Sequence, residues 1–457
     1  MNHLTPAAVD PLGPIAREKE LALSGLLDPA TMQQVLTGAS SRSKAAITAC
    51  RIGHIRYEPG SSFIISYSVD YTLGDRPGSF RARLYARACD KADYIRRARS
   101  LHEKSWIPGA LLSDPVVLAE HQAIAYEFPN DARLPHLATF AQPATIMKIM
   151  QRIAAGAFPG HVVSQHRLEL RLLRYKPESR CVLYCAVECD PRGDAPGGPL
   201  AVVLRTAKGG RVEATHRVLS QLYRCLPPDA PLGVPHPLFC DPRLQLSAVE
   251  WIEGEKLSDL WTSPGGNELV RKTGRALAWL HQAGAPESLE MKHSGRESRI
   301  ERALLLLETS TPAVASHVES MREQFRQDAA PARPGRTGWI HGDFHQGQVL
   351  CRGGSVWFLD FDSSAAGEIE QDLGNFKAQL LWLKLQGRLD LVEAIALSLL
   401  EGYREAARVT PDEQRIRFWC AAGLTELAAK QYRRLKADWP RTVPLLLAAA
   451  RAELWEH

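Results

Sequence analysis

The chain lacks several features that mark well-known structural classes. No segment approaches the roughly 18 uncharged apolar residues that span a bilayer, and residues 1–20 contain no apolar core of signal-peptide length. The nine cysteines are an odd number scattered over both halves, which favours reduced thiols over a disulfide framework. Neither G-x-G-x-x-G nor G-x-x-x-x-G-K-[ST] occurs. We therefore expect a cytoplasmic protein with no membrane partner and no glycine-rich loop around phosphates.

Charge and length set further bounds. The formal net charge is +5 over 457 residues, and no long basic run is present, so nothing requires a nucleic-acid partner. A site for anionic phosphates fits this balance equally well. The chain is too long for one ordinary core of roughly 100–200 residues, and its hydrophobic fraction of 45% is ample for burial. We expect two or three packed units, in a monomer or a homodimer.

The first half of the chain contains an internal duplication, which is the feature to seek first in any sequence. Three segments recur in the same order, and Arg56-Tyr57-x-Pro59 in the first copy matches Arg174-Tyr175-x-Pro177 in the second. The paired segments are 28–36 with 142–150, 54–71 with 171–189, and 123–137 with 246–260. Each copy predicts a helix, three strands, a second helix and paired short strands, because β-branched and aromatic residues alternate around turn residues.

The character of the sequence changes after Leu260. Long amphipathic patterns predict helices, interrupted by two short strands at 338–340 and 355–361. Loops are predicted at 190–199 and 327–338. Cys181, Cys185 and Cys189 recur on one strand and are interpreted as small buried residues, because no clustered histidine or cysteine completes a zinc set.

One motif of the second half carries chemistry. In WIHGDFHQGQVL, His341 and Asp343 follow a strand and Gln348 lies five residues further on; a second strand then ends in Asp360 and Asp362. Phosphoryl transfer needs a carboxylate that orients the attacking hydroxyl, and oxygen ligands that hold magnesium against the β- and γ-phosphates. Magnesium leaves much of its shell to phosphate and water, so one amide and one or two carboxylates suffice. We assign Asp343 as the base and Gln348 and Asp360 as ligands.

These residues carry a family resemblance. HGDFHQGQVL followed by FLDFDSSAAGEIEQDLGNF resembles the aminoglycoside phosphotransferase and choline kinase-like superfamily, whose signature is H-G-D-x-x-x-x-N, then a metal-binding aspartate and a D-L helix start. Gln348 replaces the usual asparagine, which is similar to maltokinases and related sugar and aminosugar kinases that also carry an N-terminal cap domain. The resemblance runs from about Arg167 to the C-terminus. It implies that Asp343 is the catalytic base, that His341 shapes its loop and that Asp372 caps the following helix.

The two histidines of the motif leave alternatives open. His341 is favoured as a hydrogen-bonded structural residue over a proton carrier. His345 is either a substrate contact or an exposed residue. A zinc site of His341, Asp343 and His345 is conceivable from ligand type alone, but neighbouring amides and the lack of a further histidine motif disfavour it.

The second copy is predicted to be the nucleotide-binding small lobe. Arg205 lies where kinase-like lobes place a strand lysine, with Glu213 as its helix partner; Lys208 at the strand end is the alternative. Arg83 occupies the comparable place in the first copy. The remaining candidates are Ser179 and Arg180 for phosphate, and Glu250, Trp251 and Ile252 for adenine, with Trp251 equally well explained as core.

The overall prediction is an α+β, protein-kinase-like bilobal fold, with an additional N-terminal lobe that duplicates the small lobe. Its expected domains are a cap at 1–138, a small lobe at 139–258 and a helical catalytic lobe at 259–457. The expected activity is ATP- and Mg²⁺-dependent transfer of the γ-phosphoryl group to a hydroxyl of a sugar, aminosugar or aminoglycoside-like acceptor. Candidate acceptor contacts are His345, Asp362, Glu368, Glu370 and Tyr432.

Alternatives remain for the acceptor side and for the function. Trp419 and Leu424 are favoured as helix core. A pseudokinase or nucleotide-sensing scaffold is suggested by Arg205 and the extra lobe, although the complete set of base and ligands speaks against it. A protein kinase is disfavoured, because no activation segment follows Asp360.

Overall fold

The structure is a computed structural model and describes most of the chain. The described residues are 23–40, 45–58, 62–140, 142–157, 162–190, 198–285, 293–311, 314–328 and 336–455, without the side chains of 162, 164–167 and 293–298. Most of the predicted loops at 190–199 and 327–338 lies outside them. The chain divides into two compact units. The first unit holds described residues of Met1–Val212, Leu238–Ala248 and Arg433–Ala437, and the second holds those of Glu213–Pro237, Val249–Tyr432 and Asp438–His457.

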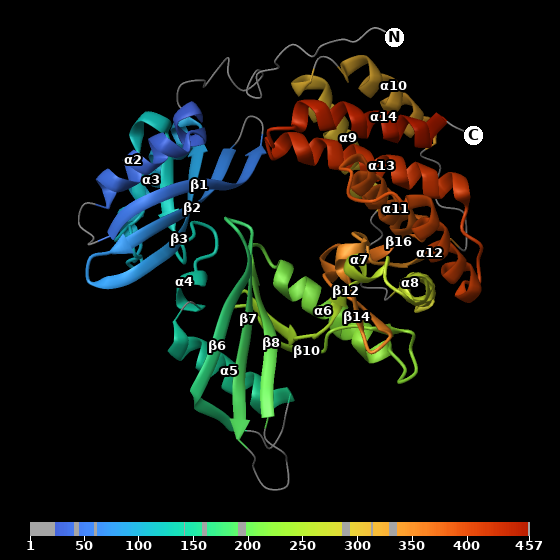
Figure 1. Cartoon of the computed structure of the whole chain (residues 1–457), viewed down its shortest axis with the longest axis horizontal. Helices are drawn as coiled ribbons and strands as arrows, with labels where there is room; N and C mark the ends of the chain where they lie inside the picture. The colour runs from blue at the N-terminus through green and yellow to red at the C-terminus, as the bar shows by residue number, and fades with distance from the viewer. Residues whose placement is uncertain are drawn as a thin grey trace. The chain divides into compact units, whose positions relative to one another are not determined.

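Two five-stranded sheets form the first unit, and their strands follow each other in the same way (Figure 1). The first sheet has the order β1-β2-β3-β5-β4 and the second has the order β6-β7-β8-β11-β10. Their strands are β1 (Ala45–Glu58), β2 (Ser62–Leu73), β3 (Arg76–Cys89), β4 (Val116–Leu118), β5 (Ala123–Glu127), β6 (Val162–Lys176), β7 (Arg180–Asp190), β8 (Gly198–Ala207), β10 (Pro237–Asp241) and β11 (Leu246–Glu250), of which β10 and β11 each share an end with the second unit. Long hairpins are antiparallel, with Ile55 opposite Ile65 in the first sheet and Cys185 opposite Val202 in the second.

Helices accompany both sheets. They are α2 (Pro29–Ala39), α3 (Lys91–Ser100), α4 (Leu137–Phe140) and α5 (Pro143–Ala157). The start of α2 is fixed by Asp28, whose carboxylate accepts from the backbone N–H groups of Ala30 and Thr31, and by proline at the first helical position. Each sheet buries one face in its own core, because residues two apart on a strand share a face.

The cysteines of the second sheet behave as the sequence predicts. Cys181, Cys185 and Cys189 alternate with other residues of β7 and are at most 5% exposed. They pack in the core of the second sheet, and all nine cysteines are free thiols. Their role is to fill space beside larger apolar side chains.

The second unit is mainly helical and contains short strands. Its helices are α6 (Arg211–Cys225), α7 (Leu257–Leu260), α8 (Gly266–Gln282), α9 (His293–Ser310), α10 (Ala315–Gln327), α11 (Glu370–Leu385), α12 (Val392–Ala406), α13 (Glu413–Arg433) and α14 (Trp439–Trp455), of which α6 and α13 each share an end with the first unit. Its strands are β9 (Leu232–Gly233), β12 (Glu255–Lys256), β13 (Thr337–Ile340), β14 (Val349–Arg352), β15 (Ser355–Phe358) and β16 (Ala365–Glu368). Within the described residues, no helix is long and apolar enough to cross a bilayer.

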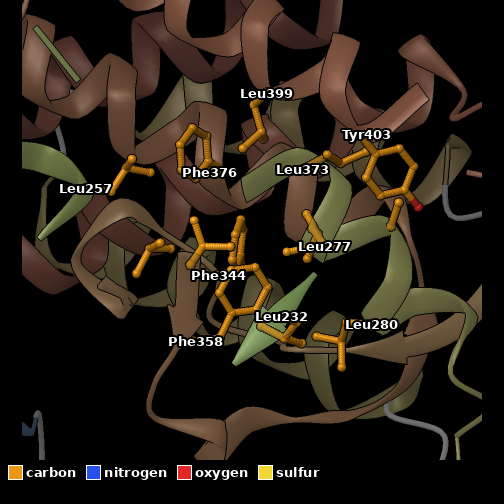
Figure 2. Close-up of a cluster of buried hydrophobic side chains, with 14 of the residues drawn as sticks. Leu232, Leu257, Leu277, Leu280, Phe344, Phe358, Leu373, Phe376, Leu399 and Tyr403 are labelled. Carbon is orange, nitrogen blue, oxygen red and sulfur yellow. The ribbon is translucent and has the colours of Figure 1, made fainter. Parts of the chain in front are cut away.

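The core of the second unit supports the segment that carries the motif. Figure 2 shows Phe344 and Phe358 together with leucines from α8 and α11. The rings of Phe344 and Phe358 lie 4.9 Å apart, and those of Phe344 and Phe376 lie 5.7 Å apart. Because Phe344 is fully buried in this core, its packing fixes the position of the loop residues on either side of it.

Candidate active site

The loop that follows β13 is built around a glycine. Gly342 has a φ of +79°, and a Cβ atom there would lie 2.1 Å from the carbonyl oxygen of Ser363. Only glycine fits both conditions. Strand β13 pairs with β16 through Ile340 and Ala365, so the chain turns sharply at the sheet edge and carries Asp343 away from it.

The buried carboxylate of Asp372 fixes this turn through hydrogen bonds to its backbone. Its carboxylate is fully buried and accepts from the backbone N–H of His341 at 2.6 Å and of Gly342 at 2.8 Å. Burial alone would raise the pKa of Asp372, but the hydrogen bond from His281 and the charges of His281 and His341 lower it below its ordinary value. The prediction that Asp372 caps its own helix is wrong: α11 begins at Glu370, and the side chain points at another segment's donors.

His341 has a structural position. Its Nε2 lies 2.8 Å from the carbonyl oxygen of Leu359, and its ring lies 4.9 Å from that of Phe361. The side chain is fully buried, and no described residue hydrogen-bonds its Nδ1. The ring therefore ties the motif loop to the segment that follows β15.

Gln348 and Asp360 come together at the end of this loop. The amide Nε2 of Gln348 lies 3.5 Å from Asp360 Oδ2. Asp360 adopts the left-handed conformation, with φ +62° and ψ +60°, so β15 ends at Phe358 and not at the predicted residue 361. Asp343 is exposed on the same loop. The arrangement thus offers one carboxylate to solvent and a facing amide–carboxylate pair.

His345 and Asp362 lie on the same two segments. His345 Nδ1 accepts from the backbone N–H of Gly347 at 3.0 Å. Burial lowers the pKa of His345, while the charge of Asp343 raises it in part; the ring is therefore neutral at pH 7, with its proton on Nε2. Asp362 Oδ1 accepts from the Thr215 hydroxyl at 3.1 Å, so it braces α6 against this segment.

Three other acceptor candidates are occupied by the protein. Glu368 is 3% exposed; it binds Arg415 through both oxygens and accepts from Trp419 Nε1 at 2.7 Å. Glu370 is fully buried and accepts from Arg336. Tyr432 is 1% exposed. These side chains have internal partners or neighbours, and the glutamates do not present the free carboxylates that were predicted to attract an amino group.

The predicted nucleotide contacts are distributed over the two units. Ser179, Arg180 and Arg205 belong to the first unit; Glu213, Glu250, Trp251 and Ile252 belong to the second. Within the first unit, the carbonyl of Ser179 accepts from the Lys208 N–H at 3.2 Å, which joins the β6–β7 turn to the end of β8. Within the second, Glu213 pairs with Arg217 at 3.0 Å, and Glu250 accepts from the His236 N–H at 3.3 Å. The pairing of Arg205 with Glu213 stays a prediction.

Several residues of the site are not suggested by the motif. His281 on α8 bridges Asp372, with Nε2 3.1 Å from Oδ2, and Tyr403 on α12, with Nδ1 2.8 Å from the hydroxyl. Asn375 Nδ2 donates to the carbonyl of Phe344 at 2.8 Å. For His281, the only signal in the sequence is its place in the last turn of an amphipathic helix. That place does not reveal that its partner, Asp372, lies 91 residues further along the chain.

The comparisons with known proteins identify this part of the chain. Residues 192–419 match the model of the phosphotransferase enzyme family. This part of the chain belongs to that family. The match confirms the predicted enzyme class, a phosphotransferase, and the predicted superfamily. No curated protein matches the chain.

Solved structures of small-molecule kinases and of a phosphotransferase resemble the chain at low identity. Choline kinase from Cryptosporidium parvum Iowa II is 10% identical with a TM-score of 0.50, covering 69% of this chain and 96% of that one. Spectinomycin phosphotransferase in complex with ADP and spectinomycin is 11% identical with a TM-score of 0.45, covering 68% and 98%. A choline/ethanolamine kinase family protein from Mesorhizobium loti is 17% identical with a TM-score of 0.45, covering 68% and 95%. The likeness to choline kinase supports the mixed α+β fold of kinase-like phosphotransferases.

Proposed function

We propose that the protein transfers the γ-phosphoryl group of ATP to a hydroxyl of a small molecule, preferably a sugar, aminosugar or aminoglycoside-like acceptor. The observation that carries this is the 3.5 Å approach of Gln348 to Asp360, beside an exposed Asp343 on a loop fixed from below by Asp372. Phosphoryl transfer depends on positioning and charge stabilisation more than on covalent chemistry by the protein. A rigid loop with one free carboxylate suits that demand.

The facing pair fits a hard divalent cation. A carboxylate and a side-chain amide both supply oxygen, the donor that Mg²⁺ prefers. Gln348 directs its Nε2 toward Asp360, and a half-turn of the amide would direct Oε1 there instead. Among the described residues, no three His, Cys, Asp or Glu side chains converge as a ligand set, so the proposed site rests on two protein ligands. When bound, Mg²⁺ would offset the charge of the β- and γ-phosphates.

Asp343 is proposed to orient the acceptor hydroxyl and accept its proton. Its neighbour Phe344 is anchored in the core, and the Asn375 amide fixes the carbonyl of Phe344. His345 can donate from Nε2, because Nδ1 is committed to the Gly347 N–H. We propose that this N–H contacts the acceptor, since a neutral donor suits a hydroxyl or ring oxygen.

The two sheets of the first unit are proposed to be copies of one lobe. Their equal strand order supports a duplication; the second sheet would be the nucleotide-binding lobe and the first a cap. Ser179 and Arg180 in the β6–β7 turn, and Arg205 on β8, are the proposed phosphate contacts, with Glu250, Trp251 and Ile252 beside adenine. The permanent charge of an arginine suits phosphate oxygens.

The test is an unbiased screen for acceptors. Wild type is incubated with ATP, Mg²⁺ and a panel of sugars, aminosugars and aminoglycosides, and phosphorylated products are detected by mass. Asp343→Asn should lose several orders of magnitude in turnover while still binding ATP. Asp390→Asn is the matched control: Asp390 is exposed beyond the end of α11, a helix about 24 Å long that has Asp372 in its first turn. ATP binding without any product, in wild type, would favour a nucleotide-sensing scaffold.

A further inference from the structure

A polar cavity lies inside the first unit. Its volume is about 350 Å³, at the small end of the range of about 300–1,000 Å³ typical of ligand sites. Six cationic side chains line it: Arg56, Arg87, Arg96, Arg97, Arg133 and Lys208. Five come from the first sheet's half of this unit, and Lys208 comes from the end of β8 in the second.

The acidic side chains around the cavity do not balance these cations. Glu58, Asp90 and Asp93 also line it, and Glu178 is a further buried carboxylate that binds Arg87. Asp93 is already shared by Arg96 and Arg97, the latter at 2.7 Å. Asp90 accepts from the backbone N–H of Asp93 as the cap of α3. Six cations thus face four carboxylates, and an excess of two positive charges remains.

That excess resides on Arg56, Arg133 and Lys208. The ion pairs of Arg56 with Glu58 and of Arg133 with Glu178 are both long, at 3.6 Å. Glu58, the carboxylate whose charge acts on Lys208, is already paired with Arg56. Burial lowers the pKa of Lys208, and the nearby charges of Arg133 and Arg56 lower it further. Like charges held this close repel one another, and an anion between them would relieve the repulsion.

We propose that this cavity is a second binding site, for a small anion carrying two or more phosphate groups. Arginine forks match phosphate oxygens in pairs, and Arg87, 7% exposed, keeps a buried Nε that no described residue hydrogen-bonds. A single monovalent anion would not match an excess of two charges. The lining mixes carboxylates with the cations, which favours a compact ligand over a long polyanion such as nucleic acid.

The cavity adjoins the turn between β6 and β7. The side chain of Arg56 donates to the carbonyl of Pro177 at 3.2 Å, and the Lys208 N–H donates to the carbonyl of Ser179 at 3.2 Å. Glu178, at the tip, is fully buried against Arg87. A ligand held by Arg56 and Lys208 would thus contact the two residues that hydrogen-bond the β6–β7 turn, which is proposed to contact ATP.

The experiment measures binding of inorganic pyrophosphate to the full chain by isothermal titration calorimetry. Buffer with a chelator removes divalent metal, so the proposed metal-dependent nucleotide site does not contribute. We expect one pyrophosphate per chain, with affinity that falls as salt rises. Arg133→Gln and Lys208→Gln should each weaken binding by at least about tenfold, and the two variants guard against one failing to fold.

The matched control is Arg51→Gln. Arg51 is a 58% exposed arginine of the first sheet that pairs with Asp70, outside the cavity lining, so its loss changes net charge equally. It should leave the affinity unchanged. Equal weakening in all three variants, or no binding to wild type, would overturn the proposal. A parallel titration with ADP separates the sources: equal sensitivity of ADP to Arg133→Gln identifies a nucleotide tail as the ligand, and insensitivity identifies a free phosphorylated compound.

Discussion

Asp372 offers the sharpest test of how the motif loop is held. Asp372→Asn keeps shape and volume but replaces one acceptor oxygen by an NH₂ group, which then faces a backbone N–H of His341 or Gly342. One charge-assisted hydrogen bond is lost and one buried donor is left without a partner, at a cost of about 3 kcal/mol. Because about 1.4 kcal/mol corresponds to tenfold, amide hydrogens of residues 337–350 should exchange about a hundredfold faster.

Hydrogen exchange followed by mass spectrometry measures this effect directly. Asp28→Asn is a matched control, because Asp28 also accepts from two backbone N–H groups but is exposed to solvent, and asparagine caps helices as well as aspartate. It should leave segment 337–350 unchanged. If residues 337–350 of Asp372→Asn exchanged at the same rate as in wild type, the view that the buried carboxylate fixes the loop would be refuted.

The same substitution has a pH dependence with a definite sign. The pKa of Asp372 is lowered in the folded protein, so its contribution is present above the ordinary carboxyl pKa of 3.8 and is lost as pH falls below it. The urea midpoint should therefore differ between wild type and variant at pH 7, and this difference should shrink below about pH 4. Tryptophan emission reports the unfolding of the second unit, since every tryptophan except Trp106 lies there.

Three further predictions address other parts of the chain. Gln348→Ala should raise the Mg²⁺ concentration needed for half-maximal turnover at least about tenfold. Gln348→Asn keeps the amide, so its Mg²⁺ requirement should lie between those of wild type and Gln348→Ala. An equal Mg²⁺ requirement in the two variants would argue against an amide ligand. His54 has a pKa lowered to about 4, first by burial and then by Arg434 and other cations. Its contribution to stability is therefore complete above pH 6.5 and is lost as the pH falls toward 4. In calorimetry, the free energy of unfolding of His54→Gln should fall by about 2 kcal/mol less than that of wild type over this range, and the exposed His102→Gln should behave as wild type. Glu178→Ala should destabilise the first unit by about 3 kcal/mol because it leaves Arg87 buried without its partner, and a melting temperature equal to that of wild type would contradict this.

The local motif could be predicted from the sequence because its residues are close together in the chain. Asp343, Gln348 and Asp360 fall within 18 residues, and strand patterns on both sides fix which end of each strand they follow. The sequence repeat is recognisable for the same reason, since Arg56-Tyr57-x-Pro59 and Arg174-Tyr175-x-Pro177 are short local matches; that the two sheets are copies of one lobe stays a proposal.

Long-range partners could not be predicted. The contacts of Asp372 with His341 and His281 span 31 and 91 residues, and a helix-start aspartate is equally typical of a cap. Glu368 and Glu370 were assigned to substrate because acidic residues near a motif suggest an open site, but Arg415 and Arg336 neutralise them in the interior. Propensity describes a residue's own segment and does not describe which distant side chain faces it.

The burial of Glu178 has a consequence for how this chain can be divided. The tip of the β6–β7 hairpin is inserted among Arg87, Asp131 and Tyr175, with the Glu178 N–H bound to Asp131 and the Tyr175 hydroxyl on the same carboxylate. Cutting the chain between the two sheets would expose a guanidinium on one piece and a carboxylate on the other. The two sheets are therefore complementary parts, and a recombinant fragment that holds only one of them is expected to require the other for solubility.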